Sequence, residues 1–270
     1  MVVQHNLSAM NTNRQMGVVT SALQKSTEKL SSGYKINRAG DDAAGLSISE
    51  KMRSQIRGLN KASDNAQDGI SLIQVAEGAL NETHSILQRM NELATQAAND
   101  TNTSVDRQSI KDEIEQLNAE LDRISTTTQF NKQDLLTGKF SGKLQVGALE
   151  GQTMDLKIST AVSSTGLKVN VIKVSTNENA GKAMKSIQDA IESVSKQRSK
   201  LGAIQNRLEH TINNLDTNAE NTQAAESRIR DTDMADEMVQ YSKNNILSQA
   251  GQSMLTQANQ QTQGVLSLLQ

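Results

Sequence analysis

The segment from Gly40 to Ser47 has the glycine spacing of a phosphate-binding loop and is the first candidate for chemistry in this chain. Such a loop needs a preceding strand and a lysine that reaches the phosphates. Here Leu46 occupies the lysine position, and no strand pattern precedes Gly40. We therefore interpret the segment as a turn that opens a long helix.

Four acidic residues near the C-terminus, Asp231, Asp233, Asp236 and Glu237, carry the oxygen ligands that Ca²⁺ prefers. An EF-hand loop that began at Asp231 would need glycine in place of Asp236 and glutamate in place of Ser242. The acidic group is better explained as a solvated helix face with negative charge at a helix N-terminus, which the helix dipole favours.

Histidine, cysteine and serine offer little further chemistry. His5, His84 and His210 are far apart, and no His-Glu-x-x-His motif is present. The absence of cysteine excludes a disulfide framework, a Cys-ligated zinc site and a thiol nucleophile. No serine lies in a Gly-x-Ser-x-Gly motif. We expect no enzymatic activity, no metal and no cofactor.

Composition sets further limits. With 28 basic and 30 acidic residues, the net charge of −2 argues against electrostatic binding to nucleic acid. No apolar run approaches the length of a membrane-spanning helix, and residues 1–30 lack the regions of a Sec signal peptide. The chain has no proline, two tyrosines and two phenylalanines. Because proline costs about 3 kcal/mol inside a helix, its absence favours long, uninterrupted helices.

The elements that must position these residues are visible in the hydrophobic periodicity. From Met52 to Leu87 a seam of mostly apolar residues steps by four and three, which is a heptad pattern. A second seam, from Leu72 to Ala97, lies about 100° around the same helix. At ~1.5 Å per residue, a helix over residues 46–98 spans roughly 75–80 Å and contacts two partners at once.

Two more heptad seams, Ile110–Ile124 and Met184–Leu215, predict the partner helices, and the polar residues 99–103 separate the first of them from the long helix. Between these partners the period changes to two, which predicts β-hairpins over about residues 140–175. The fold class is therefore mainly α: a long antiparallel helical bundle, a rod, with a small β-hairpin region.

Both ends of the chain repeat the heptad theme and are rich in Asn, Gln and Ser. The seam predicted for the C-terminal helix is Leu247, Gly251, Met254, Ala258, Gln261, Val265 and Leu268. A single amphipathic helix cannot bury its apolar face alone. We therefore expect the two terminal helices to pair as a coiled coil and to pack against neighbouring copies. The residues expected to drive polymerisation are Leu7, Leu23, Leu30, Leu247, Met254, Val265 and Leu268.

Six segments carry a family signature: 30–46, 49–53 and 65–71 in the N-terminal half, and 201–208, 225–231 and 246–250 in the C-terminal half. They resemble bacterial flagellins, in the same order, and the resemblance covers nearly the whole chain except about residues 140–178. The chain is identified as a member of that family, in a short form without outer variable domains.

The resemblance implies a structural subunit that polymerises into the flagellar filament for motility. It implies that residues 1–45 and 230–270 form a terminal coiled-coil domain lining an inner tube. Residues 46–229 would form the rod domain of an outer tube. The subunit would be exported unfolded through the flagellar type III apparatus and would be extracellular. The implied partners are other copies of the chain, a flagellin chaperone, a filament cap protein and a hook-associated junction protein, but neither nucleic acid nor membrane insertion.

The resemblance also implies recognition by a host Toll-like receptor. Residues 88–96 match the epitope helix of the family, which places Gln88, Arg89, Leu93 and Glu113 at receptor-contact positions. An arginine that binds in two-pronged fashion and a leucine that fills a pocket are typical of interface hot spots. For Leu93 a place in the helix core explains the residue equally well, and Arg89 and Glu113 could also be ordinary exposed charges.

Two alternatives belong to the same family. The chain could be a hook–filament junction protein, which shares the termini but usually matches the quoted segments less well. It could also be a filament protein that acts mainly as a weak or silent immune ligand. Filament growth from purified subunits tests the structural hypothesis, and receptor binding tests the immune one.

Overall fold

The computed structural model describes residues 6–268, and side-chain exposure for residues 6–261. Its five helices are α1 (Leu7–Ser32), α2 (Ala43–Ala97), α3 (Ser104–Thr127), α4 (Asn177–Arg230) and α5 (Met234–Leu268). Its strands are β1 (Gln129–Phe130), β2 (Gln133–Asp134), β3 (Phe140–Gln145) and β4 (Thr153–Ile158). The mainly α fold class with a small β region is confirmed.

The chain forms two compact units, and both boundaries between them lie within helices. The middle unit comprises Arg57–Ala219, and the terminal unit comprises Met1–Ile56 with Glu220–Gln270. The first part of α2 and the last turns of α4 therefore belong to the terminal unit. The expected boundaries were 45/46 and 229/230. The terminal unit therefore extends about ten residues further along α2 and α4 than expected.

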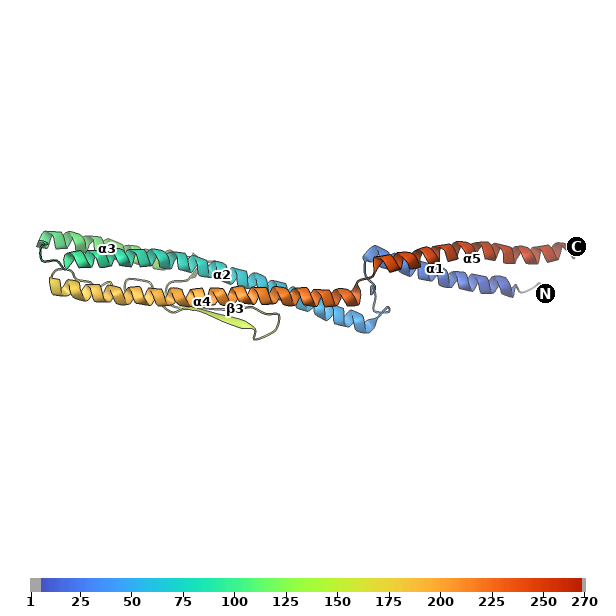
Figure 1. Cartoon of the computed structure of the whole chain (residues 1–270), viewed down its shortest axis with the longest axis horizontal. Helices are drawn as coiled ribbons and strands as arrows, with labels where there is room; N and C mark the ends of the chain where they lie inside the picture. The colour runs from blue at the N-terminus through green and yellow to red at the C-terminus, as the bar shows by residue number, and fades with distance from the viewer. Residues whose placement is uncertain (1–5, 269–270) are drawn as a thin grey trace. The chain divides into compact units, whose positions relative to one another are not determined.

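The middle unit is built on α2, α3 and α4, which run beside one another (Figure 1). Asn177 at the start of α4 donates to the carbonyl of Ala98, and Ser63 donates to Asp216 near the other end. These two contacts make α4 antiparallel to α2. A short turn reverses the chain between α2 and α3, and Arg107 closes it with a hydrogen bond to the carbonyl of Ala97.

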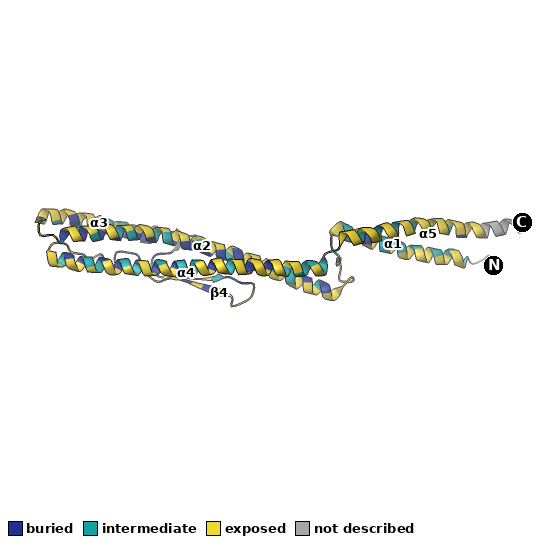
Figure 2. Cartoon of the chain, viewed as in Figure 1, coloured by how far each residue is buried: buried dark blue, intermediate teal, exposed yellow. Residues whose placement is uncertain are grey.

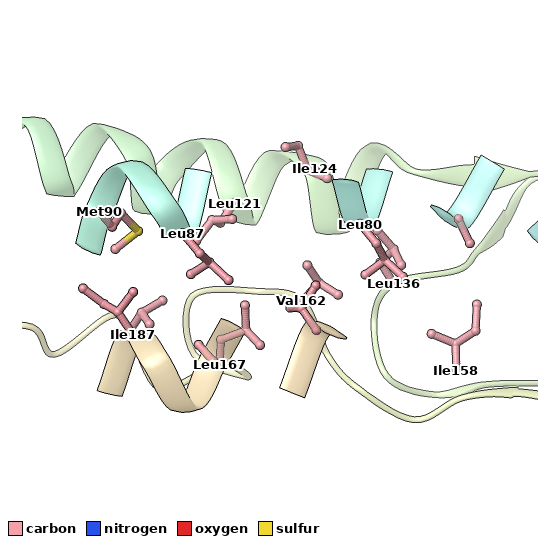
Figure 3. Close-up of a cluster of buried hydrophobic side chains, with 14 of the residues drawn as sticks. Leu80, Leu87, Met90, Leu121, Ile124, Leu136, Ile158, Val162, Leu167 and Ile187 are labelled. Atoms are coloured by element: carbon pink, nitrogen blue, oxygen red, sulfur yellow. The ribbon is translucent and has the colours of Figure 1, made fainter. Parts of the chain in front are cut away.

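A continuous apolar core fills the space between these three helices. Large side chains such as Leu80, Leu87, Leu121 and Ile187 are fully buried in it, and Figure 3 shows several of them converging from different elements. Isoleucine, leucine, methionine and alanine supply most of this core, which explains how the chain forms one with so few aromatic residues.

The β3–β4 hairpin lies against this bundle. Its strands pair antiparallel from Phe140 opposite Ile158 to Gln145 opposite Thr153. Met154, Leu156 and Ile158 alternate with polar residues and are buried, as a one-sided strand requires. At Gly58 of α2, an added Cβ would lie 2.9 Å from the Cβ of Ala148. That glycine therefore allows the hairpin turn to approach the helix closely.

The predicted β region is wrong after residue 158. Residues 160–175 form turns and an irregular loop in which a single bridge joins Thr137 and Ala161. Val169 and Val174 are nevertheless buried. The loop is fastened to α3, because Asn118 donates to the carbonyl of Val169 and Asp122 accepts from the Ser164 amide and hydroxyl. Burial of a loop produced the alternation that resembled a strand.

The terminal unit pairs α1 with α5. The side chain of Asn6 donates to the carbonyl of Ala258 near one end of the pair, and Lys29 lies 3.4 Å from Glu237 near the other. The two helices are therefore antiparallel. In Figure 2 exposed residues dominate both helices, in contrast to the buried stripes of α2 and α4. Within the described residues, no helix is long and apolar enough to cross a membrane.

Candidate assembly and recognition surfaces

The segments that first suggested chemistry prove to be helix starts. Asp42 accepts a hydrogen bond from the amide of Gly45 in the first turn of α2. Asp233 accepts from the amides of Ala235 and Asp236 and so caps α5. The turn and the helix-terminal charges predicted from the sequence are confirmed. Within residues 6–268 there is no group of three or more histidine or acidic side chains that could hold a metal ion.

The α1–α5 pair is held along one heptad seam on each helix, and the side chains of both seams are half-buried or buried. On α1 the seam consists of Ala9, Thr12, Met16, Val19, Leu23, Ser26 and Leu30. On α5 it consists of Glu237, Tyr241, Asn244, Ser248, Gly251, Leu255 and Ala258. Most seam residues of α5 are small or polar, so the pair buries little apolar surface for its length.

Outside that seam, the terminal unit also carries many large apolar side chains that are exposed. Among the described residues, ten of the fourteen exposed large hydrophobic side chains belong to this unit. They are Leu7, Met10, Val18, Ile48, Met234, Met238, Val239, Ile246, Leu247 and Met254. Only Ile36 and Ala258 represent the unit among the described buried hydrophobic residues. A surface of this kind marks an interaction site.

The heptad seam predicted for the C-terminal helix is partly wrong. Gly251 and Ala258 face α1, but Leu247 and Met254 are 44% and 57% exposed. The predicted series follows a row of residues rotated from the true seam and shares only every second member with it. Residues Val239 and Ile246, which the prediction passed over, extend the exposed surface of α5.

The other predicted polymerisation residues divide in the same way. Leu7 is 72% exposed, whereas Leu23 and Leu30 lie in the α1–α5 seam. The side chains of Val265 and Leu268 lie outside the described residues. The structure therefore separates residues that hold the pair together from residues that the pair presents outward.

The connections to the terminal helices are joined to each other. The amide of Lys35 donates to the carbonyl of Arg230, and the amide of Thr232 donates to the carbonyl of Gly33. The guanidinium of Arg230 lies 4.7 Å from the centre of the Tyr34 ring, within cation–π range. Gly33 ends α1 with a φ of 75°, which glycine adopts without strain.

Three of the four predicted receptor-contact residues are exposed, and two of them, Arg89 of α2 and Glu113 of α3, are in direct contact. Arg89 donates through Nε and Nη2 to Glu113 at 3.0 and 2.9 Å, and through Nη1 to Glu92 at 3.2 Å. The hydrogen bond to Glu113, followed by that to Glu92, raises the pKa of Arg89 above its ordinary value. Gln88 lies one residue earlier and contacts His84 at 3.0 Å.

Leu93 differs from the other three. It is 2% exposed and belongs to the core between the helices. The core explanation that the sequence left open is the one the structure shows. Leu93 therefore does not contribute to the exposed surface; among the predicted contact residues, Gln88, Arg89 and Glu113 are exposed.

Comparison with known proteins agrees with this architecture. Residues 3–141 match the model of the bacterial flagellin N-terminal helical region, and residues 184–269 match that of the C-terminal helical region. The chain belongs to the bacterial flagellin family. The flagellin of Halalkalibacterium halodurans is 57% identical, and a 31.3 kDa core protein of the flagellar filament from Treponema maltophilum is 51% identical; each alignment covers all of both chains.

A solved structure supports the fold as well. The crystal structure of Bacillus cereus flagellin is 32% identical, has a TM-score of 0.51, and covers 60% of this chain and 94% of its own. As a flagellin, the chain is a structural subunit of the flagellar filament, and it is of the short kind without a variable domain.

Proposed function

We propose that this flagellin polymerises through the outward apolar surface of its terminal unit, which packs against neighbouring copies as an inner tube. The observation that carries the proposal is the exposed apolar surface of α5: Ile246, Leu247 and Met254 face solvent, while most residues that α5 places in the seam with α1 are small or polar. Apolar burial stabilises by about 25 cal/mol per Å². Repeated along a lattice, such contacts favour assembly strongly.

The middle unit forms the outer tube in this proposal. Its core is complete within one chain, so it offers neighbours a preformed surface at little entropic cost. The test is elongation of filament fragments by purified subunits, followed by electron microscopy. We expect growth from the parent chain, and failure to grow on any seed or in a flagellin-null cell would overturn the proposal.

The exposed apolar residues also imply handling before assembly. We propose that a flagellin chaperone covers α5 in the cytosol, that the type III apparatus exports the chain, and that a cap protein and a hook-associated junction protein meet it outside the cell. The exposed row on α5 is the surface a chaperone would cover. Reduced exchange of α5 amides in a chaperone complex, with those of α2 unchanged, is the expected result; the reverse pattern would reject the assignment.

We also propose that a Toll-like receptor binds the surface formed by Gln88, Arg89 and Glu113. Three hydrogen bonds hold Arg89 in one orientation, so the guanidinium is presented with little loss of side-chain entropy on binding. Arg89→Ala should weaken receptor binding at least about tenfold, as hot-spot arginines do. Lys111→Ala, on the neighbouring helix, is the control. Equal binding of Arg89→Ala and the parent would remove this surface from the proposal.

A further inference from the structure

The turn of the β3–β4 hairpin is braced by side-chain hydrogen bonds and holds a leucine in solvent. The side-chain amide of Gln145 donates to the carbonyls of Gly147 and Leu149 at 2.8 and 2.7 Å. The amide of Leu149 donates to the side chain of Gln152 at 3.1 Å. A Cβ at Gly147 would overlap the Gln152 side chain, so the turn depends on glycine there. Leu149 is nevertheless 68% exposed.

The side chain of Leu149 takes no part in the apolar contacts that anchor the turn. Ala148 packs on Gly58 of α2 and on the small apolar cluster that includes Leu215 of α4. Leu149 and Glu150 lie beyond this anchor and are both exposed. Glu150 forms no ion pair within the described part of the chain. The hairpin therefore presents an apolar side chain with a negative charge beside it.

A groove with the opposite character lies elsewhere on the middle unit, between the loop that precedes α4 and the first turns of that helix. Its apolar lining is Val171, Ile172 and Ala183, and its volume is about 330 Å³. Lys168, Lys173 and Lys182 also line it. Glu178 contacts Lys182 at 2.6 Å, whereas Lys168 and Lys173 make no ion pair with described residues. The groove thus offers an apolar floor with positive charge around it.

We propose that in the filament the hairpin turn of one copy enters this groove of a second copy, with Leu149 on the apolar floor and Glu150 beside Lys168 and Lys173. This inference rests on the proposed polymerisation and adds a contact of the middle unit to it. The turn lies level with Leu215 of α4 and the groove level with Ala183. At ~1.5 Å per residue the two sites are about 48 Å apart.

That separation makes the contact intermolecular and heterologous, since one chain cannot bring its own turn to its own groove. A heterologous contact between different surfaces of identical subunits adds copies without closing on a pair. The inference also gives a role to the hydrogen bonds that brace the hairpin turn, because a preorganised turn loses little entropy when it binds.

The chain contains no cysteine, so introduced cysteines can report the contact without background. In a Leu149→Cys, Val171→Cys double variant, a short bis-maleimide should join the two positions on different copies. We expect a ladder of oligomers on a denaturing gel from elongated filaments, and none from dilute subunits. The matched control is Leu149→Cys with Val105→Cys, because Val105 is 72% exposed but does not line the groove.

The outcomes separate this contact from the proposed function. Filaments that grow normally but give no ladder beyond the control would overturn the contact and leave polymerisation intact. Failure of the parent chain to elongate would overturn polymerisation and this contact together. A ladder as strong in the control pair would show general proximity and would also overturn the contact.

Charge reversal provides a second test that does not depend on cross-linking. Glu150→Lys alone and Lys173→Glu alone should each raise the critical concentration for seeded elongation up to about fivefold, the range of an exposed ion pair. The double variant should recover most of that loss, because the ion pair is restored with reversed sign. Independent effects that simply add would reject the pairing. If Lys173→Glu weakens retention on a sulfated polysaccharide column but leaves elongation unchanged, the groove holds an anionic polymer and the proposed contact is wrong.

Discussion

The middle unit and the terminal unit use similar helices in opposite ways. In the middle unit, α2, α3 and α4 turn their apolar stripes inward and bury residues such as Leu80 and Ile187 completely. In the terminal unit, α5 meets α1 mainly through small and polar residues, and both helices also turn large apolar side chains outward. Heptad spacing is common to both units. The spacing alone therefore does not reveal whether the apolar face of a helix is buried within the same chain or against a neighbouring copy.

This difference separates stability of the subunit from stability of the polymer. A substitution in the middle core acts on the folded chain whatever its concentration. A substitution on the outer face of α5 acts mainly through copies that meet it, so its effect appears as a change in critical concentration. The following predictions test whether the two effects can be separated.

The largest effect is expected from deleting residues 251–270. Such a chain loses the seam residues Gly251, Leu255 and Ala258 together with the exposed Met254. We expect polymerisation to be abolished, while the middle unit keeps its helical signal and its cooperative thermal transition. Loss of that transition as well would show that the two units do not fold independently.

The next largest effect falls on folding. Leu80→Ala removes a side chain that is fully buried in the core of α2, α3 and α4, which should lower the free energy of unfolding by about 2–5 kcal/mol. Urea denaturation of dilute subunits, followed by circular dichroism, measures it. A loss below ~1 kcal/mol would mean that this core can repack, and the contrast between the units would be weaker than the burial indicates.

Leu247→Ser should show the reverse behaviour. Leu247 is 44% exposed in the subunit, so the free energy of unfolding should change by less than about 0.5 kcal/mol. If neighbouring copies bury it, the polymer should lose about 1–3 kcal/mol per subunit, which raises the critical concentration by roughly 5- to 150-fold. Ala250→Ser, at another exposed position of the same helix, also lowers helix propensity and provides the control. Unchanged elongation by Leu247→Ser would remove the residue from the assembly surface.

Much of this architecture can be predicted from the sequence, and the failures have physical causes. The heptad seams of the middle unit predicted its three helices correctly, because each apolar row is buried against other elements of the same chain. The α5 seam was misassigned because Leu247 and Met254 belong to a row that α1 does not cover. The two-residue strands β1 and β2 went unpredicted, since they are too short to show a period; their turn uses Asn131 and Lys132 with positive φ.

The candidate recognition surface was also only partly predictable. Arg89 and Glu113 are separated by 24 positions, and the antiparallel return of α3 brings them together. Leu93 fits both the heptad seam of the helix core and the receptor-contact motif. Only its burial in the structure showed that it is a core residue. A residue that fits a helical core cannot be assigned to a partner from spacing alone.

A smaller effect should follow from strengthening the weak seam. In Gly251→Ala the added Cβ lies 3.8 Å from Met16, an ordinary contact, and alanine is favoured over glycine in a helix by about 1 kcal/mol. Hydrogen exchange should slow in α5 and also in α1. Gly202→Ala is the control, because its Cβ meets nothing within 4 Å and should slow exchange in α4 alone. Unchanged exchange in α1 would show that Gly251 does not limit the pairing.

The smallest effect concerns the start of α3 and depends on pH. Thr103 donates to Asp106 through its hydroxyl at 2.7 Å and its amide at 2.9 Å, and these bonds, the hydroxyl one first, hold the pKa of Asp106 below its ordinary value. A carboxyl with a lowered folded-state pKa stabilises the fold above its unfolded pKa of about 3.9. That contribution is lost as the pH falls through the folded value. The α1 start has only a single cap, in which Asn6 accepts from the amide of Ala9.

Asp106→Asn should therefore lower the urea midpoint of the middle unit slightly at pH 7 and reduce the part of the acid-induced decline that falls below about pH 4. Asp112→Asn removes the same charge from the same helix without touching the cap, and provides the control. Parallel curves for Asp106→Asn and the parent would mean that the cap does not contribute to stability. Hydrogen exchange of the first-turn amides of α1 should not respond to Asp106→Asn, because α1 belongs to the terminal unit and is capped by Asn6 instead.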